Sequence, residues 1–387
     1  MKKTPQKIAI LGSTGNIGTQ TLDVVDWHPD KLQVVALTAQ TNIELLKKQI
    51  EKYHPLAVGV TDEESAAHLR KSVSIPVYSG PDALQKIAVL PEIDTLVSAV
   101  VGLAGIRATI DAIRCKKNIA LANKETLVAA GEIVMREARE NHVLLTPIDS
   151  EHSALAQCLQ GEQREDVEQL IITCSGGALR DKTKEELEHV SKEDALGHKT
   201  WVMGHKITVD SATLMNKGFE VIEAMRLYDI PVEKISVVIH PESIIHSMVE
   251  YRDGSIIAQL ATTDMHLPIQ YALSCPERWD SPVKRFDFSK SLTFAHPDLE
   301  RFPTLGYALS AAKIGGTLPA AMNAANDFLV GEFLQNRCRY LSIQNVIKKV
   351  LDSHKTRTNP TLEDILWAIQ DATDTAKEFL HKTDISQ

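Results

Sequence analysis

Short apolar runs alternate with stretches of helical periodicity over residues 7–148. The apolar runs, typical of buried strands, lie at 7–11, 33–37, 56–60, 94–99, 118–122 and 143–148. The helical stretches lie at 62–71, 81–90, 104–116 and 125–140. Strands and helices that alternate in this way form a parallel, doubly wound α/β sheet. We therefore expect such a sheet in a first domain at 1–149, with ligands beyond the carboxyl ends of its strands.

The pattern changes in the remaining chain, which at 387 residues in total is too long for one ordinary core. Strand-like runs recur at 170–174, 235–239 and 256–260, and His240–His246 predicts a short helix or loop. Prolines, charges and aromatic residues between 275 and 303 lack periodicity, as in a linker. Helical patterns at 305–314, 320–334, 343–351 and 362–380 indicate a bundle. We expect an α/β catalytic domain at 150–283, a linker at 284–309 and a C-terminal helical domain at 310–387.

A glycine-rich turn connects the first apolar run to a helical stretch at 19–26. Gly12, Gly15 and Gly18 follow the run directly, in the spacing Gly-x-x-Gly-x-x-Gly. A strand, a glycine turn and a helix in this order form the first unit of a dinucleotide-binding domain, with the pyrophosphate at the helix N-terminus. The alternative is a P-loop-like or purely structural turn. The strand and helix on either side favour the dinucleotide.

The end of the second apolar run indicates which dinucleotide is bound. An NAD-binding chain usually has an Asp or Glu there, which binds the ribose 2′-hydroxyl. This chain has Thr38-Ala-Gln-Thr-Asn42, without a carboxylate. The sequence therefore favours NADP, although no Arg or Lys is adjacent to bind the 2′-phosphate.

Acidic side chains follow the apolar run that ends at Ile148. Asp149 and Glu151 are two residues apart, so both point to the same side if the strand continues that far. Like charges so placed repel unless a cation lies between them. With a third carboxylate from Glu220, they would form a site for Mg²⁺ or Mn²⁺. The alternative is that Asp149 or Ser150 only caps a helix at 154–160.

Three other polar residues near expected strand ends have two interpretations each. Lys124 is either a site residue or a solvated loop charge. His152 is either a ligand or a structural residue. Ser175 begins a Ser-Gly-Gly turn, which either holds a phosphate through its amides or is only a tight bend.

The segment near 198–208 has the composition of a lid. It contains two His, two Lys and Gly204 around Trp201 and Met203. Such a composition suits a mobile loop over an anionic ligand.

The residues that follow the lid predict a polar helix from Asp210 onward. Asp210 or Ser211 can cap its first turn. Asn216, Lys217 and Glu220 then fall on one face, which suggests a ligand-binding surface. The alternative is a surface ion pair between Lys217 and Glu220.

Composition narrows the possible partners. The formal net charge of -9 argues against non-specific binding to nucleic acid or to anionic membranes. No apolar run approaches the roughly 20 residues of a membrane span. The five cysteines are scattered and form no Cys-x-x-Cys pair, which argues against a disulfide framework or a zinc site. Because Met1–Lys7 is short and polar and a strand-like run follows, we expect no targeting peptide and a cytoplasmic protein.

Several motifs, spread nearly from end to end of the chain, are shared with one enzyme family. They are Gly-Ser-Thr-Gly-Asn-Ile-Gly at 12–18, Leu-Ala-Asn-Lys-Glu at 121–125, Pro-Ile-Asp-Ser-Glu-His-Ser at 147–153, Val-Asp-Ser-Ala-Thr-Leu-Met-Asn-Lys-Gly at 209–218, His-Pro-Glu-Ser-Ile-Ile-His-Ser-Met-Val at 240–249 and Met-Asn-Ala-Ala-Asn at 322–326. The motifs at 147–153 and 209–218 are specific to that family. The chain thus resembles the 1-deoxy-D-xylulose 5-phosphate reductoisomerases.

The resemblance implies an activity that composition and spacing do not. A small phosphorylated ketose, 1-deoxy-D-xylulose 5-phosphate, would rearrange to a branched aldehyde. NADPH would then reduce the aldehyde to 2-C-methyl-D-erythritol 4-phosphate, in non-mevalonate isoprenoid synthesis. The resemblance also implies one Mg²⁺ or Mn²⁺ ion per subunit and a homodimer.

The resemblance assigns roles to individual residues as well. The metal ligands would be Asp149, Glu151 and Glu220, with Lys124 as a further catalytic residue. The substrate contacts would be Ser150, Glu151, Ser175, His198, Ser211, Asn216, Lys217 and Glu220. The lid would include Trp201 and Met203. The cofactor contacts would be Gly12, Ser13, Thr14, Gly15, Asn16, Ile17, Ala39, Gln40, Asn42, Asn123, Glu125 and Gly204.

The chain departs from the family pattern in two places. It has Gln40-Thr41 where the family often has Gly-Lys, near the expected 2′-phosphate. It has Ala178-Leu179 where the family usually has Pro-Phe after Ser-Gly-Gly, which alters the rigidity of that turn but keeps Ser175.

Two rival functions remain at this point. One is a semialdehyde-type dehydrogenase, for which Cys174 is the candidate nucleophile. The other is a non-enzymatic regulator that senses NADP, although no DNA-binding motif supports it.

Overall fold

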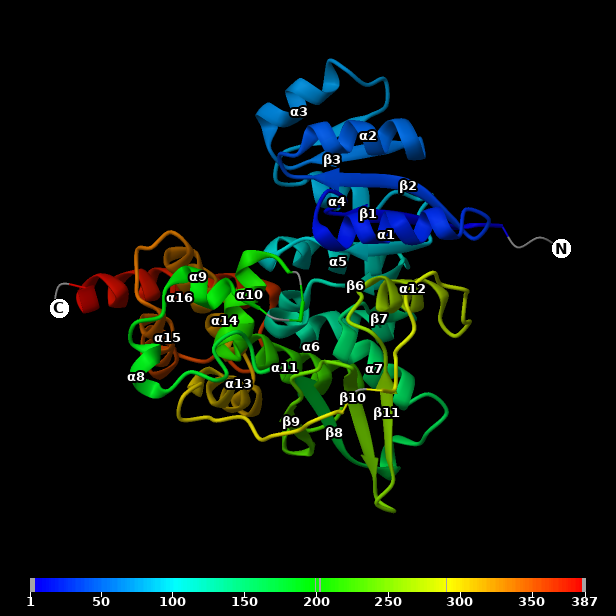
Figure 1. Ribbon diagram of the computed structural model, residues 1–387. Coiled ribbons are helices and arrows are strands. Elements are labelled where there is room, and N and C mark those ends of the chain that lie inside the picture. The colour runs from blue at the N-terminus through cyan, green and yellow to red at the C-terminus, as the bar shows by residue number, and fades with distance from the viewer. Residues whose placement is uncertain (1–3, 199, 202, 290, 385–387) are drawn as a thin grey trace. The chain divides into compact units, whose positions relative to one another are not determined.

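The structure, a computed structural model, describes residues 4–198, 200–201, 203–289 and 291–384 (Figure 1). The chain forms two compact units, each with its own sheet. Unit 1 contains the chain up to Thr126 together with Val134–Ser153 and Asp264–Val283. Unit 2 contains Leu127–Ile133, Ala154–Thr263 and the chain from Lys284 onward.

Unit 1 is built on a seven-stranded sheet in which every strand pair is parallel. Its strands are β1 Gln6–Leu11, β2 Leu32–Ala39, β3 Ala57–Val60, β4 Val77–Ser79, β5 Thr95–Ser98, β6 Asn118–Leu121 and β7 Leu145–Pro147. The order β4-β3-β2-β1-β5-β6-β7 runs outward from β1 in both directions, so the doubly wound sheet predicted from the sequence is confirmed. Only β4 was not predicted, because its three half-buried residues form no apolar run.

Helices connect these strands, and one more helix, α7, follows the last of them. They are α1 Asn16–Trp27, α2 Ile43–Tyr53, α3 Glu63–Arg70, α4 Ala83–Ala88, the 3₁₀ helix η1 Gly102–Ala104, α5 Gly105–Arg114, α6 Lys124–Glu140 and α7 Ser150–Cys158. The middle of α6, Leu127–Ile133, and the end of α7, from Ala154 onward, belong to unit 2. The core lies between sheet and helices and contains β-strand side chains such as Ile8, Ile10 and Val34 packed with Leu22 and Leu46 from α1 and α2.

Helix α12, His266–Ser274, belongs to unit 1 although it follows much of unit 2 in the chain. Its Ile269 and Leu273 lie in the core of unit 1. Gln270 is 3.0 Å from the His28 ring, Oε1 to Nε2, at the end of α1. Residues 264–283 were expected in the second domain. The segment packs with the first because the apolar face of α12 covers α1.

Unit 2 contains a four-stranded mixed sheet in the order β11-β10-β8-β9. Its strands are β8 Val167–Cys174, β9 Ile235–Ile239, β10 Ile245–Tyr251 and β11 Ile256–Leu260. Strands β8 and β9 are parallel, and β10 is antiparallel to both of its neighbours. The sequence predicted a helix or loop leading from His240. A loop is present at 240–244, where Ser243 has a φ of +53°, but the central strand β10 already begins at Ile245, inside the predicted segment.

The helices of unit 2 lie mainly in the second half of the chain (Figure 1). They are α8 Lys184–Leu187, α9 Lys192–Leu196, α10 His205–Thr213, α11 Met215–Tyr228, α13 Pro303–Ile314, α14 Leu318–Leu334, α15 Tyr340–Ser353 and α16 Leu362–Asp384, with 3₁₀ helices η2 Arg164–Asp166 and η3 Val232–Lys234. Helix α14 packs against α15 and α16, and α13 packs against α11. The helical C-terminal region predicted from the sequence is confirmed. Among the described residues, no helix combines the length and the apolar character that a membrane crossing requires.

Candidate active site

The glycine turn of unit 1 brings the chain unusually close to itself. Gly12 has φ +81°, and a Cβ atom on it would lie 2.7 Å from the carbonyl oxygen of Ala99. A Cβ on Gly18 would collide with the carbonyl oxygen of Gly12. Gly15 is the N-cap of α1 and offers no side chain to the first N–H groups of the helix. These N–H groups can therefore bind an anion, as expected for a pyrophosphate.

The side chain of Ser13 is turned into the core and does not face a ligand. Ser13 is fully buried, and its hydroxyl is bonded to the Thr38 carbonyl oxygen (3.1 Å) and to Gln49 Oε1 (2.7 Å). The N–H of Gly12 donates to Thr38 Oγ1 at 2.8 Å. These bonds tie the glycine turn to the end of β2, so Ser13 can contact a cofactor only through its backbone.

The end of β2 carries no charged group that would select a cofactor. Ala39 is buried and Gln40 is exposed. The Asn42 side chain caps α2 by accepting from the N–H of Leu45 at 3.2 Å. The absence of an acidic residue here agrees with the preference for NADP inferred from the sequence.

Asn123 and Glu125 follow β6 and brace neighbouring loops of unit 1. Asn123 Nδ2 donates to the carbonyl oxygens of Val100 (3.1 Å) and Gly102 (2.6 Å) and to Glu125 Oε2 (2.9 Å). Both residues are buried. They fix the loop after β5, which lies at the carboxyl edge of the sheet next to β1.

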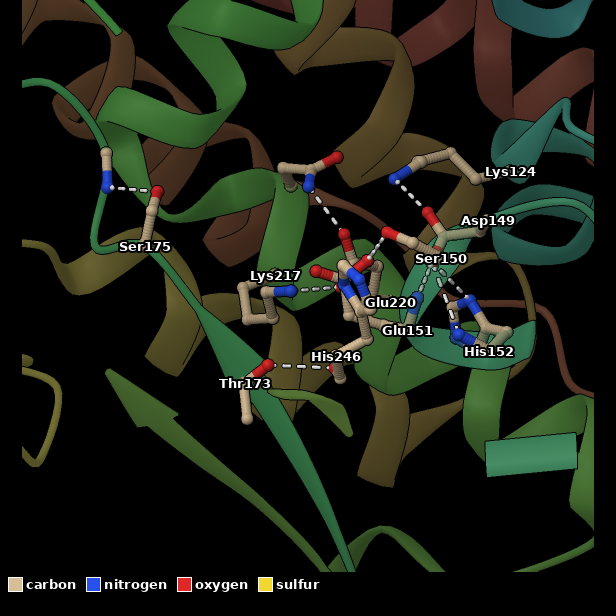
Figure 2. A network of polar contacts seen from close by, with 12 residues as sticks. Lys124, Asp149, Ser150, Glu151, His152, Thr173, Ser175, Lys217, Glu220 and His246 are labelled. Carbon is tan, nitrogen blue, oxygen red and sulfur yellow. Dashed lines mark hydrogen bonds and ion pairs between the residues drawn. The ribbon is translucent and has the colours of Figure 1, made fainter. Parts of the chain in front are cut away.

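Lys124 is a buried member of the site. Its Nζ lies 3.0 Å from Asp149 Oδ2, and the two side chains are only 8% and 12% exposed (Figure 2). The alternative interpretation, a solvated loop charge, is therefore wrong. Removal of either partner is expected to destabilise the protein, because the other buried side chain loses an opposite charge at 3.0 Å.

Asp149 and Glu151 are positioned by the start of a helix. Strand β7 ends at Pro147 and α7 begins at Ser150, so the alternation of strand side chains does not apply, and that part of the sequence argument is wrong. Asp149 Oδ1 accepts from the N–H groups of Glu151 (3.1 Å) and His152 (3.4 Å), which makes Asp149 the cap of α7.

Two neighbours further orient these carboxylates. His152 Nδ1 lies 3.0 Å from Asp149 Oδ1, and His152 is fully buried. The Ser150 hydroxyl donates to Glu151 Oε2 at 2.6 Å (Figure 2). Only Oδ1 of Asp149 takes part in capping, and Oδ2 pairs with Lys124.

In unit 2, two helices replace the single helix that was predicted from Asp210. Helix α10 begins at His205, and Leu214, with φ +64°, separates it from α11. Asp210 is buried within α10, pairs with Lys206 Nζ at 2.9 Å and accepts from Asn326 at 2.7 Å. It is therefore not a cap. The pairing of Lys206 with Asp210 was not predicted, although their spacing of four residues in a helix indicates it.

Asn216, Lys217 and Glu220 share one face of α11, as predicted. Asn216 Nδ2 donates to Glu220 Oε1 at 2.5 Å, and Lys217 Nζ pairs with Glu220 Oε2 (Figure 2). The side chains of Lys217 and Glu220 are 4% and 2% exposed. The alternative of a surface ion pair is therefore wrong, and the face is a buried polar cluster.

The Ser-Gly-Gly turn follows β8 and packs against α10. Gly176 and Gly177 have φ values of +85° and +75°, which only glycine adopts readily. A Cβ on Gly177 would collide with the carbonyl oxygen of Ser211. Ser175 and Ser211 therefore lie in adjoining segments. Ser175 Oγ is 3.0 Å from His198 Nε2.

The last residues of the segment near 198–208, which was predicted to be a lid, are helical, because α10 begins at His205. The Trp201 ring lies 6.0 Å from the His246 ring, and Trp201 and Met203 are half-buried. Gly204 is the exposed N-cap of α10. Lys199 and Val202 of the lid lie outside the described residues.

Comparisons with known proteins point to one family. The sequence profile described as 1-deoxy-D-xylulose 5-phosphate reductoisomerase matches residues 8–131. The profile of its C-terminal domain matches residues 145–228, and a further DXP reductoisomerase C-terminal domain matches residues 260–375.

Curated relatives and solved structures agree with these profiles. The chain is 50% identical over 379 residues to 1-deoxy-D-xylulose 5-phosphate reductoisomerase 1 of Bacillus thuringiensis subsp. konkukian, covering 97% of this chain and 98% of the relative. It is 52% identical over 378 residues to the reductoisomerase of Chlorobium chlorochromatii, covering 96% and 99%. The Zymomonas mobilis reductoisomerase in complex with NADPH has a TM-score of 0.91 at 40% identity, covering 97% and 99%. DOX-P reductoisomerase in complex with NADPH, fosmidomycin and magnesium has a TM-score of 0.94 at 36% identity, covering 98% and 99%.

Proposed function

Because the chain belongs to the 1-deoxy-D-xylulose 5-phosphate reductoisomerase family, we propose that it converts 1-deoxy-D-xylulose 5-phosphate to 2-C-methyl-D-erythritol 4-phosphate with NADPH and a divalent metal ion. The observation that carries the proposal is the high identity to such enzymes over nearly the whole chain. The reaction serves non-mevalonate isoprenoid synthesis. A semialdehyde dehydrogenase is not supported, and its candidate nucleophile Cys174 is buried.

The three acidic residues Asp149, Glu151 and Glu220 are the proposed metal ligands. Among the described residues they make up one of the groups whose carboxylate oxygens could hold a metal ion. A donor set of carboxylates without Cys fits a hard cation such as Mg²⁺ or Mn²⁺, one per subunit. The bound ion supplies Lewis-acid polarisation of the ketone and its neighbouring hydroxyl. The Lys124 ammonium, 3.0 Å from Asp149, offsets part of the negative charge.

The proposed substrate contacts come from both units. Lys124 and Ser150 bind oxygens beside the metal, and the remaining contacts bind the phosphate and the hydroxyl groups. These remaining contacts are Ser175, His198, Ser211, Asn216 and Lys217. Support for them comes from the burial of Lys217 and from the Ser175–His198 contact. Trp201 and Met203 belong to a lid that excludes water from the reactive fragments.

NADPH is the proposed hydride donor, bound along the carboxyl edge of the unit 1 sheet. The N-terminus of α1, with Gly12–Ile17, holds the pyrophosphate. Ala39, Gln40 and Asn42 lie beside the 2′-phosphate, and Asn123, Glu125 and Gly204 contact the nicotinamide half. The open N-terminus of α1 supports the first part of this assignment.

The test of the function is oxidation of NADPH, followed at 340 nm, with 1-deoxy-D-xylulose 5-phosphate as substrate. We expect turnover that falls to background when EDTA removes the ion and that returns on addition of excess Mg²⁺ or Mn²⁺. The product is identified by its mass. Turnover that persists in EDTA would contradict the metal assignment, and no turnover with the metal present would contradict the function.

We further propose that the protein is a cytoplasmic homodimer that pairs through the β11 edge of the unit 2 sheet. Strand β11 lies at that edge and exposes Ile256, Ile257 and Leu260, by 53%, 40% and 37%. An apolar edge strand of this kind favours pairing with another chain. The cytoplasmic location is supported by the five cysteines, all of them free thiols.

Substitution of Ile257 by Lys tests the dimer. We expect light scattering to report a dimer for the unchanged protein and a monomer for the variant, because a charge would be buried in the interface. Leu56→Lys is the control, since Leu56 is 55% exposed and lies in unit 1. A variant at Ile257 that remains dimeric at micromolar concentration would exclude this edge.

A further inference from the structure

The turn after β8 is closed by hydrogen bonds that meet at Ser175. The N–H of Gly177 donates to Ser175 Oγ at 3.2 Å, and the His198 ring approaches the same oxygen with Nε2 at 3.0 Å. On the other side of the residue, Arg180 Nη1 donates to the Ser175 carbonyl oxygen at 2.5 Å. The backbone and side chain of Ser175 are thus held separately.

The surroundings of His198 determine which of its nitrogens carries hydrogen. Its Nδ1 accepts from the N–H of Trp201 at 3.1 Å and from the N–H of Thr200 at 3.3 Å. A nitrogen that faces two N–H donors must itself be without hydrogen. The ring is therefore neutral with its hydrogen on Nε2, and Nε2–H donates to Ser175 Oγ.

The direction of these bonds leaves Ser175 as a donor. A hydroxyl oxygen has two acceptor sites, and here both are occupied, by Gly177 and by His198. The hydroxyl hydrogen needs a third group as acceptor, and none of the described residues accepts it. A phosphate oxygen is such an acceptor, and a hydroxyl that donates to an anion forms one of the stronger hydrogen bonds. Burial, and then the charge of Arg180, lower the pKa of His198, which supports the neutral ring.

Arg180 is itself fixed in place. Its Nε and Nη2 donate to the Asp181 carboxylate at 3.1 and 3.3 Å, which leaves Nη1 for Ser175. Arg301 Nη1 donates to the carbonyl oxygen of Arg180 at 3.1 Å. The Arg180 side chain passes over Gly176, where a Cβ would lie 2.6 Å from Arg180 Cδ.

The residues between the glycines and Arg180 do not by themselves make the turn rigid. They are Ala178 and Leu179, neither of which restricts φ as proline would. Two glycines in left-handed conformations make the turn flexible in isolation. Leu179 is fully buried, and the side-chain hydrogen bonds add further rigidity to the turn.

We propose that Arg180 is a positioning residue for the phosphate of the substrate, because it holds the Ser175 carbonyl so that the Ser175 hydroxyl donates its hydrogen to the phosphate. This inference rests on the proposed function. It assigns to Arg180 no direct contact with the phosphate, and its effect must therefore pass through Ser175.

Kinetics of Arg180→Met test the proposal. We expect KM for 1-deoxy-D-xylulose 5-phosphate to rise about tenfold, the effect of one charge-assisted hydrogen bond, with kcat within about threefold. Arg180→Lys, which keeps the charge but not the fork of donors, is expected to give an intermediate KM. Arg252→Met is the matched control, because Arg252 pairs with Asp166 outside the site and should leave KM unchanged.

A double-mutant cycle with Ser175→Ala separates action through Ser175 from direct action. We expect Arg180→Met to raise KM no further once Ser175 is Ala. Additive effects would overturn the proposal, because they would mean that Arg180 acts on the phosphate by itself. An unchanged KM in Arg180→Met would also overturn it.

The ¹⁵N spectrum of the histidine rings gives a readout that needs neither turnover nor a folded variant of Arg180. At pH 7.5 we expect His198 in the unchanged protein to carry hydrogen on Nε2 only, with its signal assigned from its loss in His198→Asn. Hydrogen on Nδ1 would overturn the hydrogen-bond direction. If the unchanged protein gave no turnover but showed this tautomer, the proposed function would fail while the description of the turn stood.

Discussion

Glu220→Gln is expected to lower kcat/KM by on the order of a thousandfold, which corresponds to about 4 kcal/mol of transition-state stabilisation. The variant keeps the size of the side chain but removes a charged ligand from the proposed metal site. It also removes the negative charge that pairs with the buried ammonium of Lys217. The measurements are NADPH oxidation and Mn²⁺ affinity by calorimetry, and both are expected to weaken together.

Two comparisons make the result for Glu220 specific. Glu233→Gln is the matched control, because Glu233 pairs with Lys313 at the surface and is 58% exposed. Glu220→Asp retains the charge and is expected to recover part of the Mn²⁺ affinity. A melting temperature within a few degrees of the unchanged protein shows that Glu220→Gln folds. Normal Mn²⁺ affinity in a folded Glu220→Gln protein would remove Glu220 from the ligand set.

Gly18→Ala is expected to weaken NADPH binding tenfold or more and to destabilise the protein by about 1–3 kcal/mol. A Cβ on Gly18 would lie 2.6 Å from Ser13 Cα and would also collide with the Gly12 carbonyl oxygen. Both contacts are with backbone, so the glycine turn must open and move away from the N-terminus of α1. Titration of NADPH by its fluorescence gives the affinity, and urea unfolding gives the stability.

Gly331→Ala is the control for this substitution. Gly331 lies in α14 with open space around its Cα, and Ala is favoured over Gly in a helix by about 1 kcal/mol. The control should therefore bind NADPH normally and be no less stable. Unchanged NADPH affinity in Gly18→Ala would mean that the turn does not bind the pyrophosphate as proposed.

The fold of unit 1 could be predicted because its strands are nearly continuous apolar runs with a helix between each pair. Such runs are typical of strands buried on both faces. The sheet of unit 2 was harder to predict because of β10. This strand directly follows the polar turn that starts at His240, and no helix separates it from β9. The position of α12 was not predictable from local pattern, since it depends on packing of Ile269 and Leu273 against a helix more than 200 residues earlier in the chain.

Within the candidate site, residue types were predicted better than their geometry. Lys217 and Glu220 were expected on one face of a helix, and they are. Asp149 and Glu151 were expected at a strand end, whereas a helix N-terminus positions them. The contacts of Arg180 were not predicted, and Lys206 was expected only as one of the basic residues of the lid. Their partners depend on tertiary packing, which periodicity does not report.

The residue between α10 and α11 that has a left-handed conformation is a leucine, although glycine adopts this conformation without strain. A positive φ costs a leucine about 1–2 kcal/mol. Leu214 is only 3% exposed, and burial of a leucine side chain contributes about 1.5–3 kcal/mol. Hydrophobic packing therefore outweighs the torsional penalty and fixes the corner at which two helix axes meet. Because the buried Leu214 side chain holds this corner in place, Ser211 on one side and Asn216 on the other keep a fixed separation.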